Sequence, residues 1–150
     1  MLREQAEWKT EHLSKMQNRN EFYMKLALEV AQASYCQRKQ VGALIVQGDN
    51  VIAIGYNGTI SGFPNVCELE DGTTRPDVLH AESNAIAKCA KSSNTSDGAA
   101  LYVTLSPCFE CAKIIIQSGI KEVYYLEEYR NTDGLNLLNQ SQIYVQQIIL

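Results

Sequence analysis

Two cysteines and one histidine are the side chains of this sequence best suited to bind a metal ion. Cys108 and Cys111 lie three residues apart in the segment TLSPCFECAK, directly after Pro107. At this spacing in the first turn of a helix, both sulfur atoms lie on one face, and the positive end of the helix favours their ionised form. The pair can therefore bind one metal ion together.

Nitrogen ligands for the same ion have to come from another part of the chain. Zinc in proteins is held by about four ligands, mostly sulfur and nitrogen, and the sequence contains two histidines, His12 and His80. His12 lies in a polar N-terminal segment, whereas His80 belongs to LHAESNAI, an alanine-rich helical pattern. A site made of His80, Cys108 and Cys111 leaves one coordination position for water, which is typical of a catalytic zinc.

Glu82 stands two residues after His80 and has the chemistry of a proton carrier. Zinc lowers the pKa of a bound water to about 7, and a nearby carboxylate can take the proton and deliver it to a substrate. Residues two apart on a regular helix point away from each other, so His80 and Glu82 converge only if His80 lies in the irregular first turn. We therefore expect the metal where two helix N-termini meet.

The other cysteines leave alternatives open. A Cys-x-x-Cys pair is also compatible with a redox pair, two buried thiols, or a structural zinc site completed by Cys67 or Cys89, but a redox pair gives Glu82 no role. We expect Cys89 in the core and Cys36 and Cys67 as core or loop thiols, with a second metal site as the alternative. Five cysteines without the spacing of a small secreted protein favour metal binding or catalysis over disulfides.

Length and composition predict one domain over residues 1–150, with residues 1–20 as a polar helix or tail. A chain of 150 residues with 45% hydrophobic content can bury one ordinary core. No segment has the apolar length of a signal peptide or a membrane span, so we expect a cytoplasmic protein without a membrane partner. The net charge of -4 offers no basic surface for a polynucleotide. A small-molecule substrate is expected.

Apolar periodicity predicts the elements that must position these residues. A helix over 20–34 would bury Phe22, Leu26, Val30 and Ala33. Strands over 41–46 and 51–56, joined by the turn residues QGDN, predict an antiparallel hairpin. Further expected elements are helices over 79–91, 108–118 and 133–139 and strands over 101–105, 123–126 and 143–150. In the helix over 79–91, Leu79, Ile86 and Ala90, together with Ala85 and Ala87, are expected to pack closely on the sheet.

The order of these elements predicts the fold class. A strand, a helix and a strand between residues 101 and 126 imply parallel pairing through a crossover helix, and the complete pattern predicts a three-layer α/β/α domain with a mixed sheet. The glycine-rich segment 55–76 is long for a loop inside a domain, and such loops are commonly functional. We expect it at the rim of a substrate site.

The sequence resembles the deoxycytidylate deaminases of the cytidine deaminase-like superfamily. The motif H-x-E followed by P-C-x-x-C is a signature of zinc deaminases. The resemblance runs from about residue 23 to residue 129, through SYCQRKQVGALIV, GYNGTISGFPNVCE, LHAESNAI, LYVTLSPCFECAKIIIQSGIK and VYYLEEY. It implies a five-stranded mixed sheet flanked by helices and one Zn²⁺ per chain, bound by His80, Cys108 and Cys111.

The resemblance also implies the reaction, which is hydrolytic deamination of dCMP to dUMP and ammonia, supplying dUMP for thymidylate synthesis. Glu82 would protonate N3 of the cytosine ring while a zinc-activated water attacks C4. Asn57 would hold the deoxyribose, the Ser106 carbonyl would accept the departing amine, and Arg38 and Lys39 would meet the phosphate. For Arg38 the alternative is a solvated loop charge. The implied substrate contacts are Asn57, Arg38, Lys39, Thr59, Asn84, Ser106 and Tyr125.

Further expectations rest on the same resemblance. It implies a homo-oligomer, as a hexamer, and dCTP and dTTP as effectors. Ile60 stands where the family usually has proline, which leaves the effector response open, and no histidine except His12 is available to build a second zinc site with Cys36 and Cys67. The alternatives are a zinc deaminase of the same fold acting on cytosine, guanine, a pteridine precursor or tRNA adenosine, and a zinc-stabilised binding protein without turnover.

Overall fold

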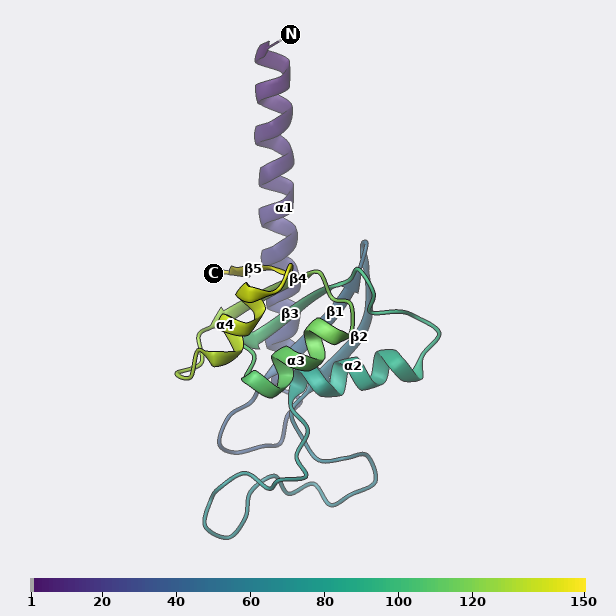
Figure 1. Cartoon of the computed structure of the whole chain (residues 1–150), viewed down its shortest axis with the longest axis vertical. Helices are drawn as coiled ribbons and strands as arrows, with labels where there is room; N and C mark the ends of the chain where they lie inside the picture. Colours follow the sequence, from purple (N-terminus) through teal and green to yellow (C-terminus); the bar gives the residue numbers. More distant parts are fainter. Residues whose placement is uncertain (1) are drawn as a thin grey trace.

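The computed structural model describes residues 2–150 and shows a mixed five-stranded sheet with helices on both faces (Figure 1). The strand order across the sheet is β2-β1-β3-β4-β5. The strands are β1 (Gly42–Gln47), β2 (Asn50–Tyr56), β3 (Ala100–Leu105), β4 (Glu122–Glu127) and β5 (Tyr144–Gln147). The helices are α1 (Leu2–Ala31), α2 (Ala81–Lys91), α3 (Phe109–Gln117) and α4 (Asp133–Gln140). The predicted three-layer α/β/α class is confirmed.

Strand pairing follows from the connections. Gly48 and Asp49 join β1 to β2 in the predicted antiparallel hairpin, and Gly48 has a φ of 62°, which glycine adopts at no steric cost. Strand β3 pairs antiparallel with β1 and parallel with β4, and α3 forms the crossover between β3 and β4. Strand β5 then pairs parallel with β4. The predicted strand-helix-strand unit is therefore confirmed.

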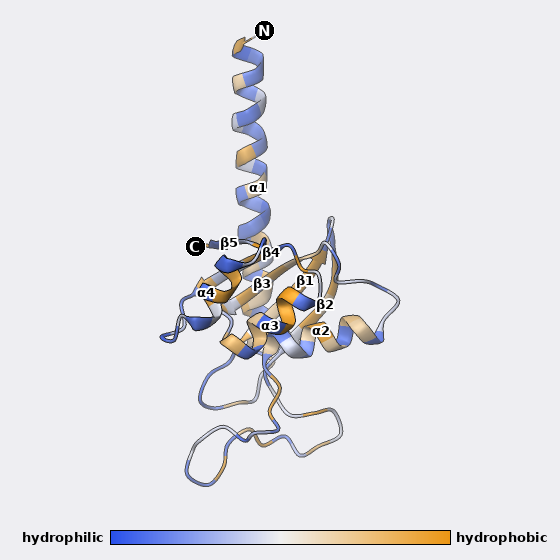
Figure 2. Cartoon of the chain, viewed as in Figure 1, coloured by the Kyte–Doolittle hydropathy of each residue, from blue (hydrophilic) through white to orange (hydrophobic). Residues whose placement is uncertain are grey.

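The two faces of the sheet bury two separate cores. Successive side chains of a strand point to opposite faces, so Ala43 and Ile45 of β1 pack in the cluster with α2 and α3, while Leu44 and Val46 pack in the cluster with α1. Burying one side chain such as Leu44 stabilises the fold by about 2 kcal/mol relative to leaving it exposed. Figure 2 shows the central strands β1 and β3 and helix α3 as largely hydrophobic. These two cores place α2 and α3 side by side on one face.

Helix α1 is longer than predicted, and its buried face is shifted from the predicted one, although Leu26 and Val30 are half-buried against the core. The helix is continuous from Leu2 to Ala31, so residues 2–20, predicted as a polar helix or tail, are helical. The predicted inward residue Phe22 is 57% exposed, and Ala33 lies beyond the end of the helix. The buried residues of α1 are Tyr23, Met24, Ala27 and Ala31. The physical reason is close backbone packing, because Gly42 of β1 lies directly against the main chain of Ala27 and Ala31.

The first half of α1 projects beyond the sheet (Figure 1) and is mostly hydrophilic (Figure 2). Its large apolar side chains Leu2, Trp8 and Leu13 are exposed. Within residues 2–150, none of the helices combines the length and the apolar character that crossing a membrane requires.

Helices α2 and α3 begin slightly later than predicted. Helix α2 starts at Ala81 and α3 at Phe109, so His80 and Cys108 each stand one residue before a helix. The inward face predicted for α2 is only partly right, since Ala85 is buried and Ile86 is half-buried against the core, whereas Ala87 and Ala90 are exposed. The buried apolar residues of α2 are Ala81, Ala85 and Cys89. Small side chains at four-residue spacing let the helix pack closely on the sheet, and Cys89 lies in the core as predicted.

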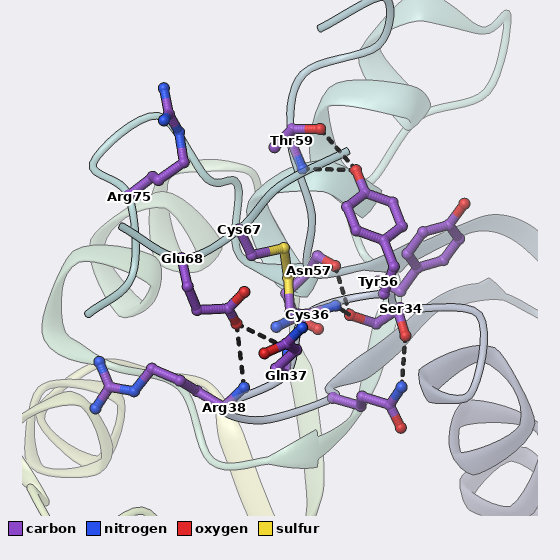
Figure 3. The surroundings of a disulfide bond; sticks show 12 residues. Ser34, Cys36, Gln37, Arg38, Tyr56, Asn57, Thr59, Cys67, Glu68 and Arg75 are labelled. Carbon is purple, nitrogen blue, oxygen red and sulfur yellow. Dashed lines mark hydrogen bonds between the residues drawn. A yellow bond between two sulfur atoms is a disulfide. The ribbon is translucent and has the colours of Figure 1, made fainter. Parts of the chain in front are cut away.

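The prediction of free thiols at Cys36 and Cys67 is wrong, because these two residues form a disulfide. They are 31 residues apart in sequence and 5.2 Å apart between Cα atoms. One lies after α1 and the other in the long loop before α2 (Figure 3). The spacing pattern failed here because only the tertiary structure brings these two loops together. The remaining cysteines, Cys89, Cys108 and Cys111, are free.

Candidate metal centre and active site

The N-termini of α2 and α3 bring three potential metal ligands together. The Nδ1 atom of His80 lies 3.5 Å from the Sγ atom of Cys108 and 3.3 Å from that of Cys111. His80 and Cys108 both have extended backbone conformations immediately before their helices, with ψ values of 158° and 171°. This geometry is the irregular first turn that convergence with Glu82 requires. Among residues 2–150 no other group of three such side chains clusters in this way.

The two thiols differ strongly in acidity. The pKa of Cys108 is lowered to about 4, because its sulfur accepts a hydrogen bond from Cys111 and a further one from His80. The pKa of Cys111 is raised, because its proton is donated to Cys108 and because the side chain is buried. The pKa of His80 is raised in turn, mainly by its hydrogen bond to Cys108. The hydrogen bonds therefore favour the ionised form of Cys108, and the thiolate is the form that binds metals.

Glu82 is a buried carboxylate beside this cluster. Glu82 is 4% exposed, and this burial raises the pKa of its carboxyl group to about 7. Hydrogen bonds from its own backbone N–H and from Cys111, together with the charge of His80, act in the opposite direction. A carboxyl group that both binds and releases a proton near neutral pH is suited to general acid and base work.

The cluster opens into a cavity of about 280 Å³. Four predicted substrate contacts line it, namely Arg38, Lys39, Asn57 and Ser106. His80, Glu82 and Cys108 line the same cavity. The tertiary structure thus brings residues from both ends of the hairpin, from α2 and from the end of β3 to one place.

Asn57 and Ser106 are both held by the main chain. The Oδ1 atom of Asn57 accepts the N–H of Val41 at 2.8 Å, and its Nδ2 donates to the carbonyl of Lys39 at 2.7 Å. The Ser106 hydroxyl accepts the N–H of Tyr129 at 2.7 Å. These bonds fix both residues at the wall of the cavity.

The two cations of the cavity differ in their partners. Lys39 forms an ion pair with Glu127, with 2.6 Å between Nζ and Oε2. Within residues 2–150, Arg38 has no carboxylate at ion-pair distance. Arg38 is therefore the cation more available to an anionic ligand.

Three predicted contacts lie outside the residues that line the cavity. Thr59 receives a hydrogen bond from the Tyr35 hydroxyl or donates one to it, at 2.6 Å. Asn84 donates to the carbonyl of Tyr56 at 3.0 Å. Tyr125 is half-buried and packs against the core beside α2 and α3. Within residues 2–150, these three side chains hydrogen-bond or pack against other residues of the protein and do not face the cavity.

Sequence reasoning missed several residues of the cavity wall. These are Cys36, Val41, Glu68, Thr74, Val78, Ala81, Leu105 and Tyr129. Most lie in loops, where no periodicity marks the direction of a side chain. The one usable signal was the long segment 55–76, predicted at the rim of the site, and it contributes Asn57, Glu68 and Thr74.

The donor set fits zinc. Two sulfur atoms and one ring nitrogen, all within 4.8 Å of one another, are the ligand types that zinc prefers. A set of three protein ligands leaves one coordination position open, as in catalytic zinc sites. Glu82 is close enough to hydrogen-bond Cys111, so a proton carrier stands at the edge of the site.

Comparison with known proteins agrees with this chemistry. The chain is 40% identical over 137 residues to ComE operon protein 2 of Bacillus subtilis, covering 87% of this chain and 71% of that protein. It is 42% identical over 122 residues to human deoxycytidylate deaminase, covering 75% and 67%. The crystal structure of the dCMP deaminase of cyanophage S-TIM5 in complex with dCMP and dUMP superposes with a TM-score of 0.83 at 52% identity, covering 85% and 94%.

The family model of the zinc-binding region matches most of the chain. It spans residues 17–127, which include His80, Glu82 and both metal-site cysteines. On this evidence the chain belongs to the cytidine and deoxycytidylate deaminase family, defined by its zinc-binding region.

Proposed function

We propose that residues 1–150 form one zinc-dependent deaminase domain that hydrolyses dCMP to dUMP and ammonia, supplying dUMP for thymidylate synthesis. One observation carries the proposal: a buried glutamate lies beside an imidazole and two thiols in a cavity whose wall also holds two cations. The similarity to deaminases whose names specify dCMP supports the choice of substrate.

His80, Cys108 and Cys111 would hold the zinc ion. Zinc bound there supplies Lewis-acid chemistry, since it lowers the pKa of water toward neutrality. Glu82 would protonate N3 of the cytosine ring as the water oxygen adds to C4. It would then pass the second proton of that water to the exocyclic amine, so that the bond between C4 and this nitrogen breaks and ammonia leaves. Burial supports this role, because it raises the pKa of Glu82 to about 7 and makes both proton uptake and proton release accessible.

Asn57 and Ser106 orient the nucleoside part of the substrate. The amide of Asn57 makes one hydrogen bond through each of its polar atoms, to Val41 and Lys39, and each atom has capacity for one more. That capacity suits a deoxyribose hydroxyl. The carbonyl of Ser106, at the end of β3, is the proposed acceptor for the leaving amine.

Arg38 and Lys39 bind the phosphate in this proposal. Guanidinium groups bind phosphate through paired hydrogen bonds, and Arg38 has no competing ion pair within residues 2–150. Lys39 is shared with Glu127 and contributes charge. Thr59, Asn84 and Tyr125 act indirectly, through the packing of the loops and strands that carry the cavity wall.

A substrate panel tests the proposal. Ammonia release is measured with purified zinc-loaded protein on dCMP, CMP, deoxycytidine, cytosine and guanine. The expected result is the highest kcat/KM for dCMP. A preference for an unphosphorylated base would instead favour another zinc deaminase of the same fold, and absence of turnover on every compound would favour a zinc-stabilised binding protein.

The assembly, the effectors and the location of the protein are further parts of the proposal. We propose a cytoplasmic homo-oligomer, as a hexamer, whose activity responds to dCTP and dTTP. The exposed apolar side chains Leu2, Trp8 and Leu13 of α1 support self-association, since contact with a second chain would remove them from water. Light scattering on the zinc-loaded protein, with and without each nucleotide, measures the subunit number and any change in it.

A further inference from the structure

A carboxylate in the long loop between β2 and α2 holds the backbone of the segment that carries the two cations. The Oε1 atom of Glu68 accepts the N–H of Gln37 at 2.7 Å and the N–H of Arg38 at 3.1 Å. Figure 3 shows the Glu68 carboxylate directed at this main chain, while the Arg38 side chain extends away from it. Glu68 thus contacts the backbone of Arg38 and makes no ion pair with its guanidinium.

The disulfide strengthens the same connection. Cys36 and Cys67 are the immediate neighbours of Gln37 and Glu68, so two consecutive loop residues hold three consecutive residues of the other segment. We call this group, Cys36, Gln37, Arg38, Cys67 and Glu68, the rim clamp. Covalent and hydrogen-bonded links at adjacent positions leave the backbone at Arg38 little freedom to move.

The loop around Glu68 is itself ordered by backbone hydrogen bonds. Glu68 and Thr74 pair as an isolated antiparallel bridge, and the N–H of Arg75 donates to the carbonyl of Cys67 at 2.7 Å. Gly58 and Leu79 pair in the same way at the base of the loop. The carboxylate therefore projects from a folded support.

The position of an acid in this cavity calls for a physical reason. Glu68 lines the cavity together with Arg38 and Lys39, where a bare negative charge would repel a phosphate. The two backbone N–H groups that donate to the Glu68 carboxylate partly neutralise its charge, which reduces the repulsion between Glu68 and a phosphate in the cavity. Because these bonds hold the backbone of Arg38 in place, its flexible side chain loses less conformational entropy when it binds a phosphate.

We propose that Glu68 is a positioning residue for nucleotide binding, which acts by holding the backbone of Arg38 so that the guanidinium meets the substrate phosphate. The inference rests on the proposed function, since it needs a phosphorylated substrate. It assigns to the rim clamp the discrimination between a nucleotide and the corresponding nucleoside.

The test compares dCMP with deoxycytidine as substrates of the zinc-loaded enzyme. Glu68→Ala is expected to raise KM for dCMP about tenfold, because it removes two charge-assisted hydrogen bonds that order Arg38. The kcat for dCMP and the kcat/KM for deoxycytidine should stay within about twofold, since neither depends on the phosphate contact. Glu68→Gln keeps an acceptor oxygen and should show a clearly smaller rise in KM.

Two further variants separate positioning from a general structural role. Glu70→Ala removes an exposed acid of the same loop that is not among the residues lining the cavity, and this variant should behave as wild type. In an Arg38→Ala background, Glu68→Ala should have almost no additional effect on KM for dCMP, because the two residues act through one contact. Zinc content and disulfide formation, measured by mass spectrometry, should be equal in all variants.

The outcomes distinguish this inference from the function on which it rests. If wild-type protein does not deaminate dCMP, the proposed function fails and the inference falls with it. If wild type prefers dCMP but Glu68→Ala loses activity equally on dCMP and deoxycytidine, or adds its full effect in the Arg38→Ala background, only the positioning role is overturned. Should Glu68→Ala fold poorly, the same comparison is made with Glu68→Gln.

Discussion

The backbone of Gly134, the second residue of α4, lies directly against the carbonyl group of Pro107. A Cβ atom at Gly134 would overlap the Pro107 oxygen and would stand 2.7 Å from the Cys108 carbonyl carbon. No side chain fits in this space without moving the backbone that carries Cys108. Helix α4 contributes no ligand to the metal site. It supports the site by packing against the backbone that carries Cys108.

Replacing Gly134 by alanine should weaken zinc binding. Alanine is otherwise the better helix former, by about 1 kcal/mol, but an unavoidable overlap with backbone costs roughly 1–3 kcal/mol and shifts the Pro107–Cys108 segment. Competition with a chelator should show a lower zinc affinity for Gly134→Ala.

Gly42→Ala is the matched control for this substitution. A Cβ at Gly42 overlaps the backbone of Ala27 and would stand 2.5 Å from the Ala31 nitrogen, on the α1 side of the sheet. It should lower the free energy of unfolding by a similar amount, while zinc affinity stays close to wild type. Equal zinc affinities in both variants would contradict the support that α4 gives to the site.

Glu82→Gln should separate metal binding from catalysis. Glutamine has the same shape but cannot carry the proton, and loss of a positioned proton carrier typically lowers rates by about 10²–10⁴. We expect full zinc content by elemental analysis, together with loss of ammonia release from dCMP. Wild-type turnover by this variant would mean that another group transfers the proton.

Substitution of Cys108 or Cys111 should reduce zinc binding, whereas substitution of Cys89 should reduce only the stability of the fold. Cys108→Ser and Cys111→Ser each remove a sulfur ligand, so zinc bound per chain should fall well below wild type. Cys89→Ala removes a buried thiol from the core of α2, which should lower the free energy of unfolding by about 1 kcal/mol and leave the zinc content unchanged. Zinc loss from Cys89→Ala alone would point to a different ligand set.

The Cys36–Cys67 disulfide should stabilise the protein without contributing to zinc binding. Closing a loop of this length restricts the unfolded chain and is typically worth about 2–4 kcal/mol. The double variant Cys36→Ser, Cys67→Ser should therefore unfold at lower denaturant concentration, with its zinc content retained.

Thiol trapping in cell extracts then reports whether the disulfide persists in the cell. Disulfides are rare in a reducing cytoplasm, so two trapped thiols at Cys36 and Cys67 would show that the rim clamp is held by Glu68 alone under those conditions. A double variant as stable as wild type would contradict the stabilising role.

The chemistry of the site could be predicted from local spacing. Two cysteines three residues apart after Pro107, and a histidine two residues before an acid, each place their side chains within one helix turn, and a helix start has few possible geometries. For the same reason the hairpin and the β3-α3-β4 unit were predicted from residues near one another in sequence. The interactions that decide each of these local features are short-range, whereas the approach of His80 to the two cysteines joins segments 28 and 31 residues apart.

Contacts between distant segments were decided only by the tertiary structure. Periodicity predicted that Phe22 of α1 would be buried, but close approach to Gly42 selects the face with Ala27 and Ala31 instead. The pairing of Cys36 with Cys67 depends on where two loops meet. A sequence encodes which side chains prefer to be buried or to bind metal, whereas the choice among equally apolar faces and equally reactive partners depends on which backbones can approach each other, and that is a property of the assembled fold.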